Sequence, residues 1–251
     1  MSRRFKILPL ALALAVLSIV TASCGSSATP AQVRFVNALQ DTAQYGTGVD
    51  INVNGTKEFT NVAFQGSQPS SGYTGVPSGG DTIQGFQTGS TTQIFNHNIT
   101  LNASTQYTLV ATGFASSSNT VVIISATDDN SAPANGNEKF RLINASPSGP
   151  AVDIYIVPVG SITPIAPPAT ISNVAYRSAS AYTSVAYNPN FEQGFNYTMF
   201  VTATGTPSPI LLTQTLSAGS ASAGAIRTLV LTDQQNVDKL NQSAIVLNDL
   251  N

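Results

Sequence analysis

Apolar and polar residues alternate with a period of two along much of the chain. In 49–53 and 152–156 every second residue is apolar, so one face of each segment is expected to be buried. Clusters of Gly, Pro, Asn and Ser, such as 69–72 and 147–150, separate the apolar runs and are typical of turns. Only 236–240 could form a short turn of amphipathic helix. The pattern predicts an all-β fold of short strands.

Several blocks of sequence recur in the same order in both halves of the chain. The paired blocks are 33–38 with 140–145, 49–53 with 152–156, 61–64 with 173–176, 73–76 with 182–185, 107–110 with 197–200, and 121–128 with 227–233. Collinear repetition of this kind indicates two copies of one module, each with about seven strands.

The second copy carries a family resemblance in its opening strands. Its segments 141–147 (Arg-Leu-Ile-Asn-Ala-Ser-Pro) and 150–155 (Pro-Ala-Val-Asp-Ile-Tyr) resemble the start of the domain-of-unknown-function family 4397. The first copy departs from it, with Ala-Leu-Gln-Asp at 38–41 and Asn52 where the family has Tyr. The resemblance implies two tandem immunoglobulin- or transthyretin-like antiparallel β-sandwiches in an exported bacterial protein. It implies no known activity.

The N-terminus follows the three-part pattern of an export signal. Three basic residues precede an apolar run at 7–20, and Thr-Ala-Ser-Cys at 21–24 resembles the lipobox of bacterial lipoproteins, although Thr21 replaces the usual larger aliphatic residue. Cys24 is the single cysteine of the chain, and acylation would explain its presence. An ordinary secretory signal is the alternative. An uncleaved membrane helix would need roughly 20 apolar residues, more than this run has.

These features divide the chain into five predicted segments. They are a signal peptide at 1–23, a lipid-anchored tether at 24–31, a first sandwich at 32–130, a linker at 131–137 and a second sandwich at 138–251. Because no Asp follows Cys24, we expect the lipoprotein to reach the outer membrane and to be extracytoplasmic.

Net charge and the residue types present argue against several classes of function. Without 1–23 the chain keeps seven basic and twelve acidic residues, a net charge of −5, which argues against nucleic-acid binding. Ser/His/Asp catalysis would need the single histidine, His97, which is expected in a loop or at the surface. No zinc ligand set can be assembled, and no cofactor is expected. A carboxylate pair is conceivable, since Asp81, Asp128 and Asp129 are available.

Four further sets of residues are candidates for a role. Asp128, Asp129 and Asn130 could bind calcium or form a solvated turn. Arg34 with Asp50, and Arg141 with Asp153, are expected to form cross-strand ion pairs within about 4 Å. Four tyrosines could stack on sugar rings or belong to the core: Tyr73, Tyr155, Tyr182 and Tyr187.

The sequence therefore predicts a non-enzymatic envelope lipoprotein. It would present two β-sandwich modules for cell-surface interaction or a structural role, with the membrane and an unidentified protein or glycan as partners. A carbohydrate-binding module or, less favoured, a hydrolase using Asp carboxylates is the alternative.

Overall fold

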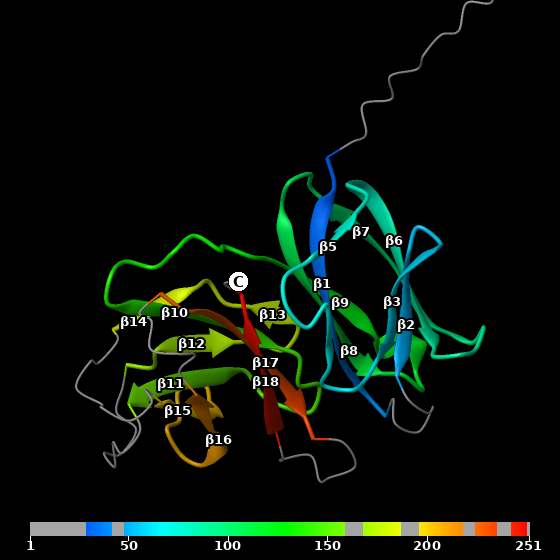
Figure 1. The fold of residues 1–251 in the computed structure, drawn as a ribbon. Coiled ribbons are helices and arrows are strands. Elements are labelled where there is room, and N and C mark those ends of the chain that lie inside the picture. Colours follow the sequence, from blue (N-terminus) through cyan, green and yellow to red (C-terminus); the bar gives the residue numbers. More distant parts are fainter. Residues whose placement is uncertain are drawn as a thin grey trace, which may run out of the picture.

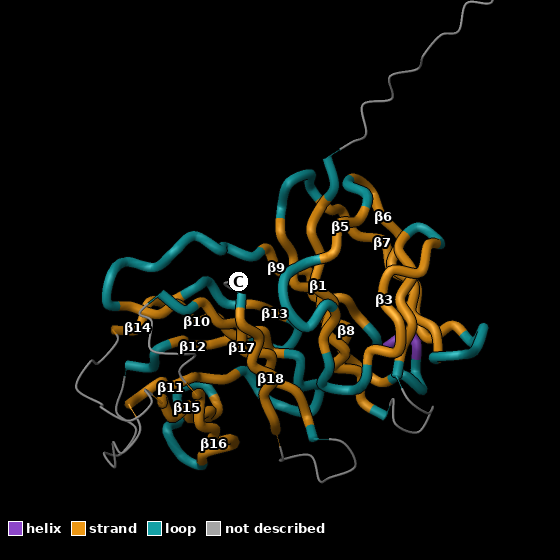
Figure 2. Tube along the Cα trace, in the orientation of Figure 1, coloured by secondary structure: helices purple, strands orange, loops and turns teal. Residues whose placement is uncertain are grey.

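The computed structural model describes residues 29–41, 48–158, 168–186, 196–217, 224–234 and 242–249. Cys24 and Tyr187 lie outside these ranges. Within them strands predominate (Figure 2), accompanied by the short 3₁₀ helix η2 (Ser118–Thr120). No helix in the described part of the chain is long and apolar enough to cross a membrane.

The first module is a sandwich of two sheets. Its strands are β1 (Ala31–Gln40), β2 (Val49–Val53), β3 (Thr56–Val62), β4 (Ser67–Gln68), β5 (Thr74–Val76), β6 (Gly79–Gln87), β7 (Gln93–Leu101), β8 (Gln106–Phe114) and β9 (Val122–Thr127). One sheet has the order β4-β1-β8-β9, with β5 also paired to β1, and the other has the order β3-β2-β6-β7.

The second module repeats this topology strand for strand. Its strands are β10 (Asn137–Asn144), β11 (Val152–Pro158), β12 (Ile171–Val174), β13 (Ser178–Ala179), β14 (Thr183–Ala186), β15 (Asn196–Ala203), β16 (Ile210–Ser217), β17 (Ile226–Asp233) and β18 (Gln242–Asn248). The sheet orders are β13-β10-β17-β18, with β14 also paired to β10, and β12-β11-β15-β16.

The predicted class, all-β with two tandem sandwiches, is confirmed. One pair in each module nevertheless runs parallel, β1 with β8 and β10 with β17. A parallel pair needs a long crossover between its strands. Here the crossover passes through the four strands of the opposite sheet and through two short strands that pair with the first strand.

The topology corrects two of the repeated blocks. Residues 107–110 lie on β8, whose counterpart is β17, whereas 197–200 lie on β15, the counterpart of β6. Residues 121–128 cover β9, whose counterpart is β18 rather than β17. Similar alternation recurs in strands with similar burial, so a short match between such strands is weak proof of equivalence.

Each module has its own apolar core, and a third cluster lies between the modules. That cluster combines side chains of both: Val36, Ala38, Val110, Ile124, Ala126, Ile143, Ala145, Val230 and Leu247. The sheet containing β1 and β8 thus packs its outer face on the sheet containing β10 and β17 (Figure 1). These four strands are therefore buried on both faces.

Candidate functional site between the two modules

The predicted ion pairs between Arg34 and Asp50, and between Arg141 and Asp153, do not form. β1 and β2 belong to opposite sheets of the sandwich, and so do β10 and β11, so the paired residues are not cross-strand neighbours. Both arginines lie on the strand faces that meet the other module.

The two aspartates have a local structural role instead. Asp50 Oδ1 accepts a hydrogen bond from the backbone N–H of Asn61 at 2.8 Å, and Asp153 Oδ1 accepts one from Asn173 at 2.8 Å. Both asparagines have a positive φ, 52° and 54°. Each carboxylate thus fixes the unusual backbone that ends the next strand.

Arg34 and Arg141 each bind the end of the last strand of the other module. Arg34 donates to Asp249 Oδ1 at 2.5 Å and to the carbonyl oxygen of Asn248 at 3.2 Å. Arg141 donates to Asp128 Oδ1 and to the carbonyl oxygen of Thr127 at 2.8 Å. The exchange is reciprocal across the contact. We call the two arginines, Asp128, Asp249 and the Tyr and Thr side chains that bind these carboxylates the reciprocal network.

The remaining bonds to the two carboxylates come from within each module. Asp128 Oδ2 accepts the hydroxyls of Tyr73 and Thr108, both at 2.7 Å. The second module repeats the arrangement. Asp249 Oδ2 accepts hydrogen bonds from the hydroxyls of Tyr182 at 2.8 Å and Thr228 at 2.5 Å.

The tyrosine rings complete the network. The guanidinium of Arg34 lies 5.4 Å from the ring centre of Tyr73, and that of Arg141 lies 4.7 Å from the ring centre of Tyr182. These are cation–π distances. The rings of Tyr73 and Tyr182 therefore pack against the arginines of the network and are not exposed for stacking on a sugar. Tyr155 is only 6% exposed.

The network is neutral and almost completely withdrawn from water. The four charged side chains are at most 2% exposed. Burial, together with the negative charge of Asp128, raises the pKa of Tyr73. Burial opposes ionisation of Arg34, but its contact with Asp249 outweighs that and raises the pKa of the guanidinium. Two positive and two negative charges compensate one another, and hydroxyls occupy much of the remaining bonding capacity.

The calcium prediction for 128–130 has no support in this geometry. Both carboxylate oxygens of Asp128 are bonded within the reciprocal network. Asp129 accepts a hydrogen bond from Lys139 Nζ at 2.9 Å. A hydrogen bond from Ser131 and the nearby Lys139 lower the pKa of Asp129 to about 2. Asn130 donates to the Tyr73 hydroxyl at 3.0 Å. Among the described residues no group of three His, Cys, Asp or Glu side chains could hold a metal.

A second pair of residues that the sequence reasoning missed joins the sheets within each module. The buried Asn37 donates to the carbonyl oxygen of Val62 at 2.8 Å, and Asn144 does the same to Val174 at 3.0 Å. Both also accept a backbone N–H two residues ahead. Their presence in both copies of the first repeated block was the available signal.

Asp249, Thr108 and Thr228 were missed as well. Asp249 follows β18 as Asp128 follows β9. Pairing Asp128 with Asp233 concealed that equivalence. Asp233 instead accepts the hydroxyl of Ser146 and the backbone N–H of Ser148 at 3.1 Å.

Two other candidates lie on the far sheet of the first module. His97 lies within β7, paired with Ile83 and half-buried, rather than in a loop. Asp81 is 3% exposed and accepts a hydrogen bond from Asn54 at 2.6 Å. Since Asp128 and Asp129 have the separate partners given above, the conceivable carboxylate pair with Asp81 gains no support.

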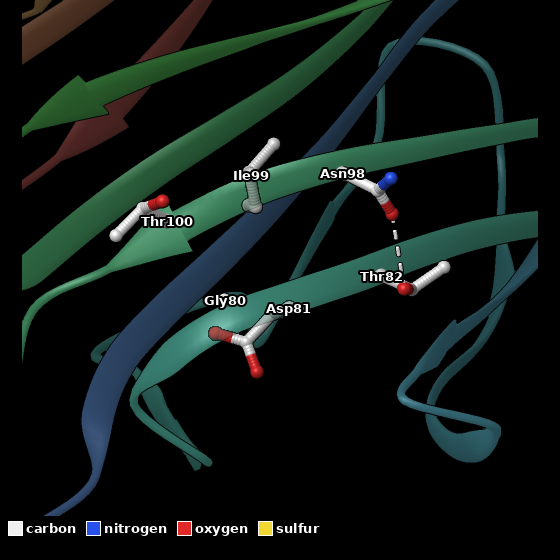
Figure 3. Close-up of a pocket in the computed structure, with 6 residues that line it drawn as sticks. All are labelled: Gly80, Asp81, Thr82, Asn98, Ile99 and Thr100. Carbon is white, nitrogen blue, oxygen red and sulfur yellow. Dashed lines mark hydrogen bonds between the residues drawn. The ribbon is translucent and has the colours of Figure 1, made fainter.

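A polar hollow of about 450 Å³ opens beside Asp81 on β6 and β7. It is lined by Gly80, Asp81, Thr82, Asn98, Ile99 and Thr100 (Figure 3). The Thr82 hydroxyl lies 3.1 Å from Asn98 Oδ1 and links the two strands at its rim. Hydroxyl and amide groups there can exchange hydrogen bonds with a small polar ligand, but they hold no nucleophile–base pair.

Comparison with known proteins gives a family match over part of the chain. Residues 31–155 match a family described as a domain of unknown function (DUF4397). A search of curated proteins found no match. One matching solved structure is CBMbc (family CBM26) from Eubacterium rectale Amy13K in complex with maltoheptaose, with 9% identity, a TM-score of 0.25, and coverage of 85% of this chain and 95% of that one. A similarity this low transfers neither fold nor ligand.

Proposed function

We propose that this chain, whose residues 31–155 match the DUF4397 family, is a non-enzymatic envelope lipoprotein presenting two sandwich modules as one rigid unit. The second module would be another domain of the same family, since it has the same strand order. The observation that carries the proposal is the reciprocal network.

Rigidity follows from the chemistry of that contact. Each arginine makes its closest ion pair with a carboxylate of the other module, so separating the modules would break both of these pairs together. The hydroxyl donors of each module hold the two carboxylates in the orientation that meets the facing arginine. The apolar cluster around Val36 and Ile143 adds burial at the same contact.

Additional hydrogen bonds extend the contact to its edges. Thr112 donates to the carbonyl oxygen of Ala145 at 2.7 Å, Arg177 donates to that of Thr120 at 3.1 Å, and Lys139 Nζ lies 3.0 Å from that of Asp129. A rigid pair keeps any binding surface at a fixed position relative to the other module.

The proposed anchor is a lipid on Cys24, with the Gly- and Ser-containing segment up to residue 31 as its tether. This would hold the unit at the outer membrane, outside the cytoplasm. The sequence pattern at 21–24 supports this part of the proposal.

The anchor is tested by metabolic labelling with an alkyne fatty acid in a bacterial host expressing the full chain. Wild type should be labelled and recovered with membranes, whereas Cys24→Ser should lose both properties. Ser27→Ala, three residues into the tether, serves as the control and should behave as wild type. Labelling that persists in Cys24→Ser would overturn the anchor.

Rigidity is tested by urea unfolding followed with separate fluorescence labels on the two modules. Both labels should report one shared transition. Two separate transitions would show that the modules are independent, and would overturn the rigid unit without touching the anchor.

A further inference from the structure

The outer face of β2, β6 and β7 carries a ladder of uncharged polar side chains. Gln84 on β6 pairs in register with Asn52 on β2 and with Asn96 on β7. The next rows toward the hollow pair Thr82 with Asn98, and Gly80 with Thr100. Alternation along the strands puts these residues on one face, while Asp81 and Ile83 are buried on the other.

We infer that this face binds a neutral oligosaccharide, seated in the hollow at Gly80. The inference deepens the proposed function, on which it rests, by naming the ligand class of the rigid unit. Amides and hydroxyls both donate and accept hydrogen bonds, as sugar hydroxyls do.

Gly80 leaves space where a side chain would otherwise stand. A Cβ built there meets no heavy atom within 4 Å. The hollow of about 450 Å³ lies within the usual size range of small-ligand sites. The Thr82–Asn98 hydrogen bond uses the Asn98 oxygen as acceptor, which leaves the Asn98 NH₂ group to donate to a ligand at the rim.

The charge of the face disfavours an anionic ligand. Lys57 and Asp50 on the ladder pair with each other at 2.6 Å. Asp81, which also lines the hollow, is buried and accepts a hydrogen bond from Asn54 at 2.6 Å. An anionic ligand would meet no unpaired cation among the described residues of this ladder and would be repelled by the Asp81 carboxylate.

Phe86 extends the face along β6. It is half-buried and lies six residues from Gly80 with the same alternation, about 20 Å along the strand. An aromatic ring can pack against the apolar face of a sugar ring. The distance suits an extended oligosaccharide rather than a single sugar.

The second module has different residues on the equivalent face. The row equivalent to Asn52–Gln84–Asn96 pairs Tyr155 with Phe200 and Thr213. The rows equivalent to those at the hollow pair Thr198 with Thr215, and Asn196 with Ser217. Because an asparagine stands at the position of Gly80, and Tyr155 and Phe200 replace two amides of the ladder, we place the inferred site in the first module only.

The test uses isothermal titration calorimetry on the full chain in a non-glycosidic detergent. The probes are maltohexaose, cellohexaose and chitohexaose. At least one should bind, with one site per chain. Gly80→Phe should fill the hollow, and Asn98→Ala should remove its donor, each weakening binding about ten-fold or more.

Thr215→Phe is the matched control, because it puts the same ring at an exposed position of β16, the counterpart of β7. It should leave affinity unchanged, and thermal unfolding should confirm that all three variants fold. Failure of all probes to bind at millimolar concentration overturns the inference, as does binding that Gly80→Phe leaves unchanged. Either result leaves the lipid-labelling and unfolding tests of the proposed function intact.

Discussion

The two modules place the same polar residue types at their mutual contact but different residues on their outer sheets. Arg34, Tyr73, Thr108 and Asp128 have structural counterparts in the second module that make the same kinds of contact. By contrast, the Asn52–Gln84–Asn96 row of the first module corresponds to a row of Tyr, Phe and Thr in the second. Repetition therefore marks the residues that build the two-module body, and divergence marks surfaces open to a separate role.

The largest effect should come from breaking the reciprocal network at Asp128. Asp128→Ala leaves Arg141 buried without its carboxylate and should lower the free energy of unfolding by about 3–5 kcal/mol, measured by urea denaturation. Asp249→Ala should cost somewhat less. In that variant Arg34 still has Asp128 at 3.6 Å, whereas Asp128→Ala removes a carboxylate from both arginines.

Asp129 is the control next along the chain. Its side chain is 59% exposed, so Asp129→Ala should change stability by less than about 1 kcal/mol. Equal losses in Asp128→Ala and Asp129→Ala would refute the special role of the network.

The second prediction concerns the repeated asparagines. Asn37→Ala and Asn144→Ala should each cost about 1–3 kcal/mol, because each leaves a buried backbone carbonyl without its donor. Denaturant unfolding of both variants checks this. The exposed Asn96→Ala should stay within about 0.5 kcal/mol of wild type. A loss of stability in only one of these two variants would contradict the equivalence of Asn37 and Asn144.

A smaller, pH-dependent difference should arise at Glu138, whose counterpart in the first module is Ala31. Burial raises the pKa of Glu138 in the folded chain above its ordinary value of 4.5, although Arg227 opposes the shift. Its contribution to stability is therefore full below pH 4.5 and is lost as the pH rises through the folded-state pKa.

Glu138→Gln should remove this loss of stability at higher pH. Unfolding free energies measured from pH 4 to pH 8 should show the variant gaining on wild type as the pH rises. A constant difference across this range would contradict the shift.

The smallest effect is expected at Lys57, whose side chain is 52% exposed. Burial opposes ionisation of Asp50, but hydrogen bonds from Lys57 and the Asn61 amide outweigh it and lower the pKa of the carboxyl. Lys57→Ala should raise that pKa and cost at most about 1 kcal/mol. An NMR pH titration of Asp50 in wild type and variant measures the change, and an unchanged pKa of Asp50 would contradict the role of Lys57.

The sequence was sufficient to predict the features that depend on local pattern, namely strand positions and the residues repeated between the modules. Alternation in 49–53 and 152–156 located β2 and β11, and the repeated Arg, Asn and Asp positions fell on equivalent strands. Their partners could not be obtained in the same way. Arg34 and Asp249 are brought together only when two sheets pack face to face, and nothing in the alternation of either strand specifies which sheets will meet.

The same limit is why the sequence left the role of the tyrosines open. An apolar block with a tyrosine at its edge is compatible with a sugar platform, a core position or a cation–π contact. Only the position of Arg34 over Tyr73, and of Arg141 over Tyr182, decides among them.

The reciprocal exchange of arginines has the form of a symmetric homodimer contact contained in one polypeptide. A lone module with this surface would recover the close arginine–carboxylate pairs by meeting a second copy, so its paired population would depend on concentration. Joining the modules through the short segment 131–137 makes the encounter intramolecular and sets its effective concentration by linker length. A sparsely expressed chain would therefore hold its paired form at any dilution.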